Sequence, residues 1–178
     1  MNPRDPHDLR AARERIVEAH LAAEAKYDFA AALATFARPR YEIMAISEVH
    51  DGADAVSAFY RESVTAFPDF RIVTERAHYA GDAIFHKVVF HGTHLGAWRG
   101  LPATGRCIEY PMLNVFLFEE DRLICEEMYF DLLTPLKQLG IARDPTTLPG
   151  RIGTAIQHPL TVGGAFLRAA LHRTGSKG

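Results

Sequence analysis

The sequence predicts an α+β fold in which helices come first and an antiparallel sheet follows. Three stretches near the N-terminus have the apolar spacing or composition of helices: residues 8–26, 29–37 and a segment that begins at Asp54. Four strand-like runs separated by turn residues follow, over 70–79, 83–91, 107–118 and 122–130. This order is typical of helices that pack on one face of a curved antiparallel sheet.

Local signals delimit the first elements. Asp28 is a favoured N-cap residue for the second helix, and Pro39 follows the end of that helix. Residues 41–48 predict a first short strand. Phe67, Pro68 and Asp69 end the third helix.

The last two strands predict a hairpin. If its turn centres near residue 120, paired positions sum to about 240, so Cys125 faces Val115. Cys107 is then too distant from Cys125 for a disulfide. The predicted inner face holds Tyr110, Met112, Asn114 and Phe116 against Ile124, Glu126, Met128 and Phe130. Both faces are apolar, so we expect a homodimer through the outer one.

The chain is long enough for one domain, which we place at residues 1–140, followed by a C-terminal extension over 141–178. Prolines and glycines in 141–160 predict an irregular tail. Residues 161–173 predict a helix that docks near a pocket mouth, with a mobile tail as the alternative.

Composition excludes several partners. The formal net charge is −2, so we expect no nucleic acid and no anionic membrane as partner. No apolar run has the length of a membrane span, and the N-terminal residues are polar. With two cysteines that lack metal-ligand spacing, the sequence favours a reduced, cytoplasmic protein.

Several motifs occur together in order. The stretch GTHLGAWRGLPATGR (92–106) is followed by a strand, an acidic turn and YFDLLTPLKQLG (129–140). The segments HDGADAV (50–56) and FPDF (67–70) precede them. Over about residues 8–140 this pattern resembles the SnoaL-like ester cyclases of the nuclear transport factor 2-like superfamily.

The resemblance implies an α+β cone, with three helices resting in a strongly curved sheet around a hydrophobic pocket. It implies a buried acid or base and no metal or other cofactor. Polyketide cyclases, isomerases, hydrolases, dehydratases and non-catalytic binding proteins all share such a cone, so the fold does not select the reaction. Cyclase-type members usually carry H-W-D where this chain has Glu126-Glu127-Met128, and often a histidine where it has Asn114.

Three residues are candidate acid or base groups. Asp131, retained from the family pattern, would have a raised pKa if it faced the pocket, whereas the alternative is a cap for the following helix. Glu126 shares the predicted inner face with Asn114, where an amide beside a carboxylic acid could polarise a carbonyl. The alternative is that the faces are reversed, so that Glu126 is solvated while Glu127 and Tyr129 point inward. His94 is a candidate proton relay at the pocket mouth, and the alternative is that it anchors the loop.

Apolar and hydroxyl-bearing residues around these groups are candidates for substrate binding. Trp98 belongs to the glycine-rich loop, which we interpret as a pocket rim. His86 and His91 lie on opposite faces of one strand and no carboxylate has matching spacing, so we expect no metal. The candidate substrate-binding residues are Asn114, Trp98, Tyr110, Met112, Met128, Tyr60 and Phe116.

Three hypotheses of function follow. The first is a small cofactor-independent enzyme that acts by general acid/base chemistry on an apolar, carbonyl- or lactone-bearing molecule. The second is a non-catalytic binding protein for such a molecule, consistent with Met128 and Asn114 at the family's catalytic positions. The third is a dimerising interaction module whose cone is filled by its own side chains.

Overall fold

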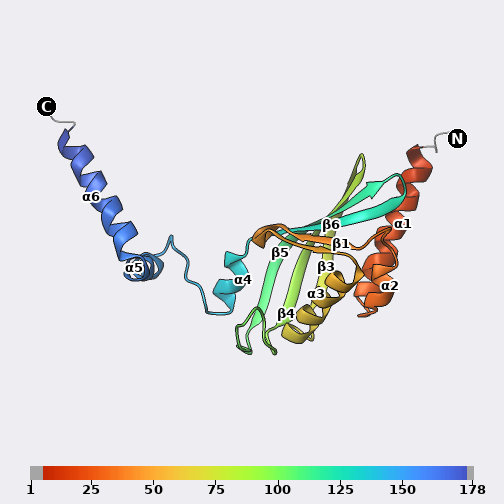
Figure 1. Ribbon diagram of the computed structural model, residues 1–178, viewed down its shortest axis with the longest axis horizontal. Helices are drawn as coiled ribbons and strands as arrows, with labels where there is room; N and C mark the ends of the chain where they lie inside the picture. Colours follow the sequence, from red (N-terminus) through yellow and green to blue (C-terminus); the bar gives the residue numbers. More distant parts are fainter. Residues whose placement is uncertain (1–5, 176–178) are drawn as a thin grey trace. The chain divides into compact units, whose positions relative to one another are not determined.

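The computed structural model describes residues 6–175 (Figure 1). The chain forms two compact units, Met1–Leu139 and Gly140–Gly178, which are described separately. Within the described residues, no helix combines the length and the hydrophobicity needed to cross a membrane.

The first unit contains a six-stranded curved sheet with the strand order β2-β1-β6-β5-β4-β3. All neighbouring strands are antiparallel except β1 and β6, which are parallel. The predicted α+β fold is therefore confirmed. The strands are β1 (Arg40–Ile43), β2 (Glu48–Asp51), β3 (Arg71–Ala80), β4 (Ala83–Thr93), β5 (Cys107–Glu119) and β6 (Arg122–Phe130).

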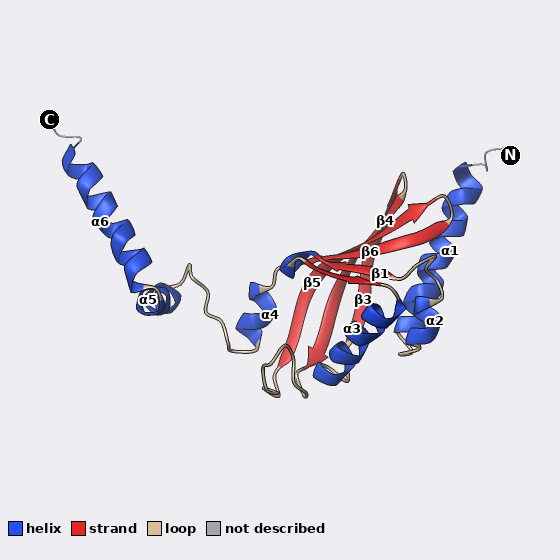
Figure 2. Ribbon diagram, viewed as in Figure 1, coloured by secondary structure: helices blue, strands red, loops and turns tan. Residues whose placement is uncertain are grey.

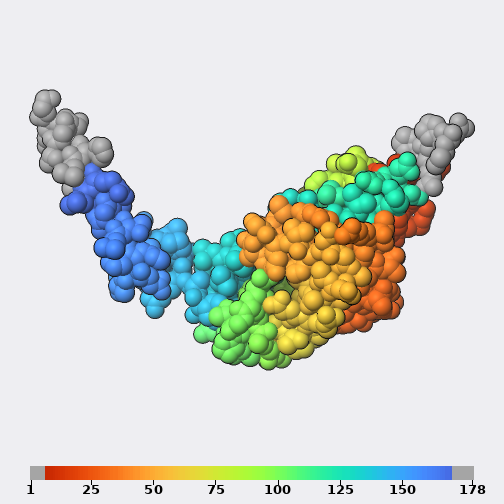
Figure 3. Space-filling model, viewed as in Figure 1, coloured from red at the N-terminus to blue at the C-terminus, as the bar shows by residue number. Residues whose placement is uncertain are grey.

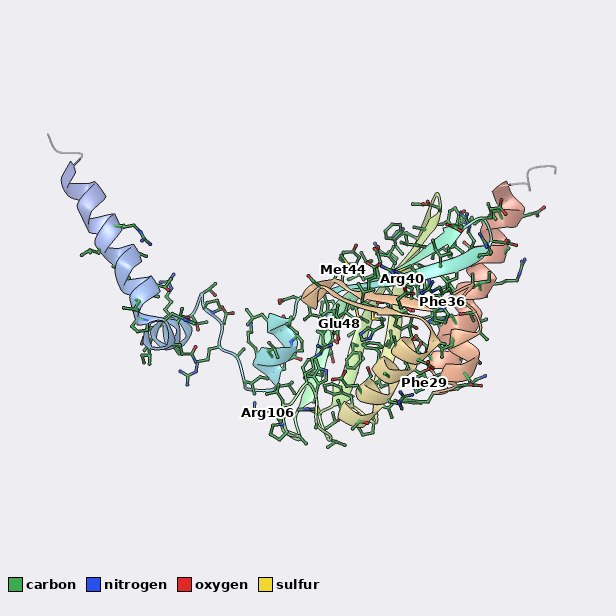
Figure 4. The ribbon with its side chains drawn as sticks, viewed as in Figure 1. Phe29, Phe36, Arg40, Met44, Glu48 and Arg106 are labelled. Atoms are coloured by element: carbon green, nitrogen blue, oxygen red, sulfur yellow. The ribbon has the colours of Figure 1, made fainter. Side chains whose placement is uncertain are left out.

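The single strand predicted over 41–48 is wrong. A 3-10 turn at Met44–Ile46 and a left-handed Ser47, with a φ of 53°, reverse the chain between β1 and β2. This reversal creates a hairpin that forms one margin of the sheet. Figure 4 shows Met44 and Glu48 on this hairpin.

Three helices pack against the sheet (Figure 2): α1 (Pro6–Glu24), α2 (Phe29–Leu33) and α3 (Ala53–Ala66). The Asp28 cap is confirmed, because the Ala31 amide donates to Asp28 Oδ1 at 3.1 Å. Apolar side chains from helices and strands form one buried core, which includes Val17, Val56, Val88, Phe116 and Leu123.

The β5–β6 hairpin contains a β-bulge that changes the predicted register. The turn pairs Glu119 with Arg122, whereas beyond the bulge Leu117 pairs with Cys125. Ile124 has no partner in the ladder. The predicted pairing of Cys125 with Val115 is therefore wrong, and Leu123, not Ile124, lies in the core.

The helix α4 (Leu133–Gln138) ends the first unit. Gln138 is bound to β5 through both its amide groups: Oε1 accepts from the Glu109 amide at 2.8 Å, and Nε2 donates to the Glu109 carbonyl at 2.7 Å. The last residues of the first unit are thereby attached to the start of the sheet strand that follows Arg106 (Figure 4).

The second unit contains α5 (Leu148–Gln157) and α6 (Pro159–Gly175). The irregular tail predicted over 141–160 is wrong, because Thr147 caps α5 and Pro149 lies in its first turn, where no amide donor is needed. Gly150 is required by packing, since a Cβ there would lie 1.7 Å from the Asp144 carbonyl oxygen. The helix over 161–173 is confirmed within α6, and its docking at a pocket mouth stays a prediction.

Candidate active site

A cavity lies between the helices and the concave side of the sheet. Its empty space is about 830 Å³, including the part that is open to solvent. Its walls are mostly aromatic and aliphatic, and Glu24, Tyr60, Ser63, Arg99, Tyr110 and Glu126 are its polar or hydroxyl-bearing lining residues. Apolar walls with a few polar groups are the composition of a small-molecule site.

Most residues named from the sequence as substrate-binding line this cavity. Tyr110, Met112 and Met128 reach it from β5 and β6, Tyr60 from α3 and Trp98 from the loop between β4 and β5. Phe116 and Asn114 are buried in the sheet beside the cavity and do not line it. Whether these residues bind a ligand stays a prediction.

Glu126 is fully buried and lines the cavity. Asn114 Nδ2 donates to Glu126 Oε1 at 2.7 Å, and the two residues lie on adjacent strands. The bulge brings them to one face. At the turn, Glu119 pairs with Arg122, and if this register continued, Asn114 would lie opposite Glu127. Because Ile124 is skipped, the register shifts by one residue, so Asn114 pairs with Met128 and Glu126 faces inward.

His20 of α1 is the positive partner of Glu126. Its Nε2 lies 3.2 Å from Glu126 Oε2 and 3.4 Å from Glu24 Oε1. Its Nδ1 lies 3.0 Å from the hydroxyl of Thr35, which itself donates to the Ala32 carbonyl. Both ring nitrogens thus face acceptors, which favours the doubly protonated ring.

The pKa of His20 follows from these contacts. Burial alone would lower it, but hydrogen bonds and charges from Glu126 and Glu24 outweigh burial and raise the pKa to about 10. At neutral pH the cluster therefore contains an imidazolium ion.

Glu24 is held by two tyrosines. Tyr60 donates to Glu24 Oε1 at 2.7 Å and Tyr41 at 3.1 Å, and the two hydroxyls are also in contact with each other. Burial would raise the pKa of Glu24, but the contacts with His20 and then those with the tyrosines lower it below its ordinary value. These contacts favour the ionised form of Glu24.

The pKa values of Glu24 and Glu126 are shifted in opposite directions. The pKa of Glu126 is raised, first by burial and then by the negative charge of Glu24, and His20 and Tyr41 offset only part of this. A raised pKa brings the free energies of the charged and neutral forms of a carboxyl group closer together at neutral pH than they are for an ordinary glutamate. Such a group is suited to accept and return a proton.

The same cluster has the composition of a metal site. One ligand atom each of His20, Glu24 and Glu126 lie within 4.8 Å of one another. An imidazole and two carboxylates suit divalent transition metals. A metal ion could bind there only if His20 Nε2, which faces both carboxylates, carried no proton. The expected absence of a metal stays a prediction.

Asp131 does not reach the cavity, and the expectation that it faces the pocket is wrong. It is exposed, and its carboxylate accepts from the Leu133 amide at 2.9 Å and from the Thr134 hydroxyl at 2.6 Å. These bonds lower its pKa and organise the start of α4. Asp131 thus supports the start of α4, as the alternative expected, although it lies one residue before the N-cap Leu132.

His94 is buried beneath the glycine-rich loop and does not line the cavity. The Thr104 amide and hydroxyl both lie within hydrogen-bonding distance of His94 Nδ1, at 3.3 and 3.1 Å. Its ring packs against Phe67 and Trp98. This geometry matches loop anchoring, and its expected position at the pocket mouth is wrong.

The loop itself forms a rim. Trp98 and Leu101 exchange two backbone hydrogen bonds around Arg99 and Gly100, both of which have positive φ. The amides of Leu95 and Gly96 donate to the Ala66 carbonyl, so the loop lies next to α3 (Figure 3). Arg99 forms an ion pair with Glu48 of β2.

The family model of SnoaL-like polyketide cyclases matches residues 14–139. The chain belongs to this family. The match includes His20, Glu24, Tyr41, Tyr60, Asn114 and Glu126, and it ends before α5. Among curated proteins, none matches at a significant level.

Solved structures agree with this fold. IdmH, a candidate polyketide cyclase from Streptomyces antibioticus, is 21% identical, with a TM-score of 0.61 over 72% of this chain and 98% of that one. A phenazine biosynthesis-related protein from Pseudomonas aeruginosa is 14% identical, with a TM-score of 0.66 over 84% and 94%. A Catenulispora acidiphila protein with a ketosteroid isomerase-like fold is 22% identical, with a TM-score of 0.59 over 71% and 92%.

Sequence reasoning missed His20 and Glu24 as functional residues. The available signal was a histidine on the apolar face of a helix with a glutamate four residues later, a spacing that places both on one side. Nothing in the local pattern distinguishes this pair from an exposed ion pair.

Proposed function

We propose that this protein is an enzyme that moves a proton on an apolar, carbonyl-bearing small molecule, with Glu126 as general base and no cofactor. The observation that carries the proposal is a buried glutamate with a raised pKa on the wall of an apolar cavity. An ionisable group in such a place is costly unless it has a function.

The surrounding groups support this role. Asn114 and His20 fix the Glu126 carboxylate from two sides, at 2.7 and 3.2 Å. In its ionised form Glu126 would take a proton from the carbon next to the substrate carbonyl, and the resulting acid would return it to another atom. Tyr60 contributes the hydroxyl of the cluster that lines the cavity, and it would turn its one hydrogen from Glu24 Oε1 to the developing enolate oxygen.

This elementary step is common to isomerisation and to aldol-type ring closure, so it can be tested without the natural substrate. Proton abstraction in D2O replaces hydrogen next to a carbonyl by deuterium. We expect the protein to accelerate deuterium incorporation into one or more members of a panel of cyclic ketones and β-keto esters, followed by NMR.

Glu126→Gln should reduce this exchange by about 10²- to 10⁴-fold. Glu127→Gln is the matched control, because Glu127 lies on the opposite face of β6 and should leave the rate unchanged. Equal rates in both variants would overturn the assignment of Glu126.

The apolar cavity also fits a binding protein without catalysis. Trp98 is the only tryptophan of the chain and lines the cavity, so its fluorescence reports occupancy. Ketones that change this fluorescence but show no catalysed exchange would favour the binding protein. A chain whose cone only supports dimerisation would respond in neither experiment.

A further inference from the structure

The buried polar atoms around Glu126 that lack a hydrogen bond include two acceptors. Among the described residues, Glu24 Oε2 and Asn114 Oδ1 have no hydrogen-bond partner, whereas Glu126 Oε2 has the ion pair with His20. Glu24 and Glu126 both line the cavity. Because a buried acceptor without a donor is destabilising, these atoms favour a ligand with N–H or O–H groups.

The charge of the site distinguishes between a neutral and a cationic ligand with such N–H or O–H groups. When Glu126 is ionised, two carboxylates face one imidazolium, so one negative charge stays uncompensated beside an apolar cavity. Among the residues described as lining the cavity, Arg99 alone carries a guanidinium or ammonium group, and it is paired with Glu48. A cationic ligand would supply the missing positive charge.

The walls suit a cation as well. Aromatic faces attract ammonium groups through the negative potential above the ring. Phe90 stacks on both Phe70 and Tyr110, with ring centroids 5.8 and 5.1 Å apart. The aromatic residues that line the cavity are Phe59, Tyr60, Phe67, Phe70, Phe90, Trp98, Tyr110 and Phe130.

We propose that the ligand of this cavity is an amphipathic amine, whose protonated nitrogen binds the carboxylates of Glu24 and Glu126 and whose apolar part packs on the aromatic walls. The proposal specifies the substrate class of the proposed function and uses the same site. It does not require that Glu126 perform catalysis.

Binding of a cationic ligand should change the protonation of Glu126. The groups that face Glu126 are His20 and Glu24 from α1, Tyr41 from β1, Tyr60 from α3, and Asn114 from β5, with His86 of β4 opposite Asn114. Glu24 disfavours the ionised form of Glu126, and a bound cation favours it. Binding should therefore displace a proton, and affinity should rise with pH through the raised pKa of Glu126.

The test uses Trp98 fluorescence with three probes of one carbon skeleton: 4-phenylbutylamine, 4-phenylbutanol and the quaternary 4-phenylbutyl-trimethylammonium ion. Near pH 7.5 we expect the amine to bind about tenfold or more tightly than the alcohol. Glu24→Gln should remove most of this preference and leave the alcohol affinity within about twofold. Glu127→Gln should leave both affinities unchanged.

Wild-type protein supplies a second measurement that does not depend on the folding of a variant. The quaternary ion keeps its charge at every pH, so a rise in its affinity with pH reports ionisation of the protein. Equal affinity for amine and alcohol, or a flat pH profile for the quaternary ion, overturns the proposal. Either result leaves the deuterium-exchange test of Glu126 intact, so the two proposals can fail separately.

Discussion

The middle of β6 and the residue just beyond its end carry carboxylates with opposite properties. Glu126 is fully buried among ionisable side chains, and its pKa is raised by burial and by Glu24. Asp131, just beyond the strand, is exposed, and its pKa is lowered by the Thr134 hydroxyl and the Leu133 amide. The comparison shows that the chemistry of a carboxylate in this fold depends on which groups surround it and not on its distance from the strand end.

The largest effect is expected at His20, because it supplies the positive charge next to the buried Glu126 in the middle of β6. His20→Asn leaves two buried carboxylates without a cation, which should lower the free energy of unfolding by about 3–5 kcal/mol. Urea unfolding measures this. His91→Asn is the control, since His91 pairs with the exposed Glu109 and should cost about 1 kcal/mol or less.

The pH dependence makes the His20 prediction stricter. A pKa raised from 6.5 to about 10 contributes stability that is fully present below pH 6.5 and is lost as the pH rises through 10. The stability difference between wild type and His20→Asn should therefore shrink from pH 7 towards pH 10. A constant difference would show that packing, and not charge, accounts for the loss.

A smaller effect is expected at the exposed end of the strand. Asp131→Ala removes two hydrogen bonds at the start of α4, so the melting temperature should fall slightly. Deuterium exchange into ketones should keep its wild-type rate, because Asp131 does not line the cavity. A large loss of exchange with an intact fold would return Asp131 to the list of catalytic residues and break the comparison.

The smallest effect on turnover is expected on the outer face of the same strands. Leu113 and Tyr129 are paired there and more than a third exposed, at 37% and 39%. We expect a homodimer through this face, as the apolar pattern predicted. In light scattering, Leu113→Glu should halve the mass of the particle while the exchange rate stays unchanged; a monomeric wild type would contradict the prediction.

The sequence predicted the fold well, because helix periodicity, strand alternation and the Asp28 cap are local signals. It predicted the side of the sheet that holds Glu126, although the expected register did not include the bulge. It could not predict that α1 brings His20 and Glu24 to the same carboxylate, since that contact joins residues far apart in the chain. The helix α5 was missed because Pro149 and Gly150 were interpreted as helix breakers, although their positions in the first turn tolerate both.

The unpaired Ile124 is an extra residue that the bulge absorbs, so neither its identity nor its presence decides which face of β6 holds Glu126. Exchanging Ile124 for another apolar residue preserves the register, so evolution can vary this side chain at little cost. Losing Ile124 would make Leu123 and Cys125 consecutive, and the pairs from Leu117–Cys125 onward would keep their partners, so Glu126 would still face inward. Natural variation in this family should accordingly tolerate both substitution and loss of the residue between Leu123 and Cys125.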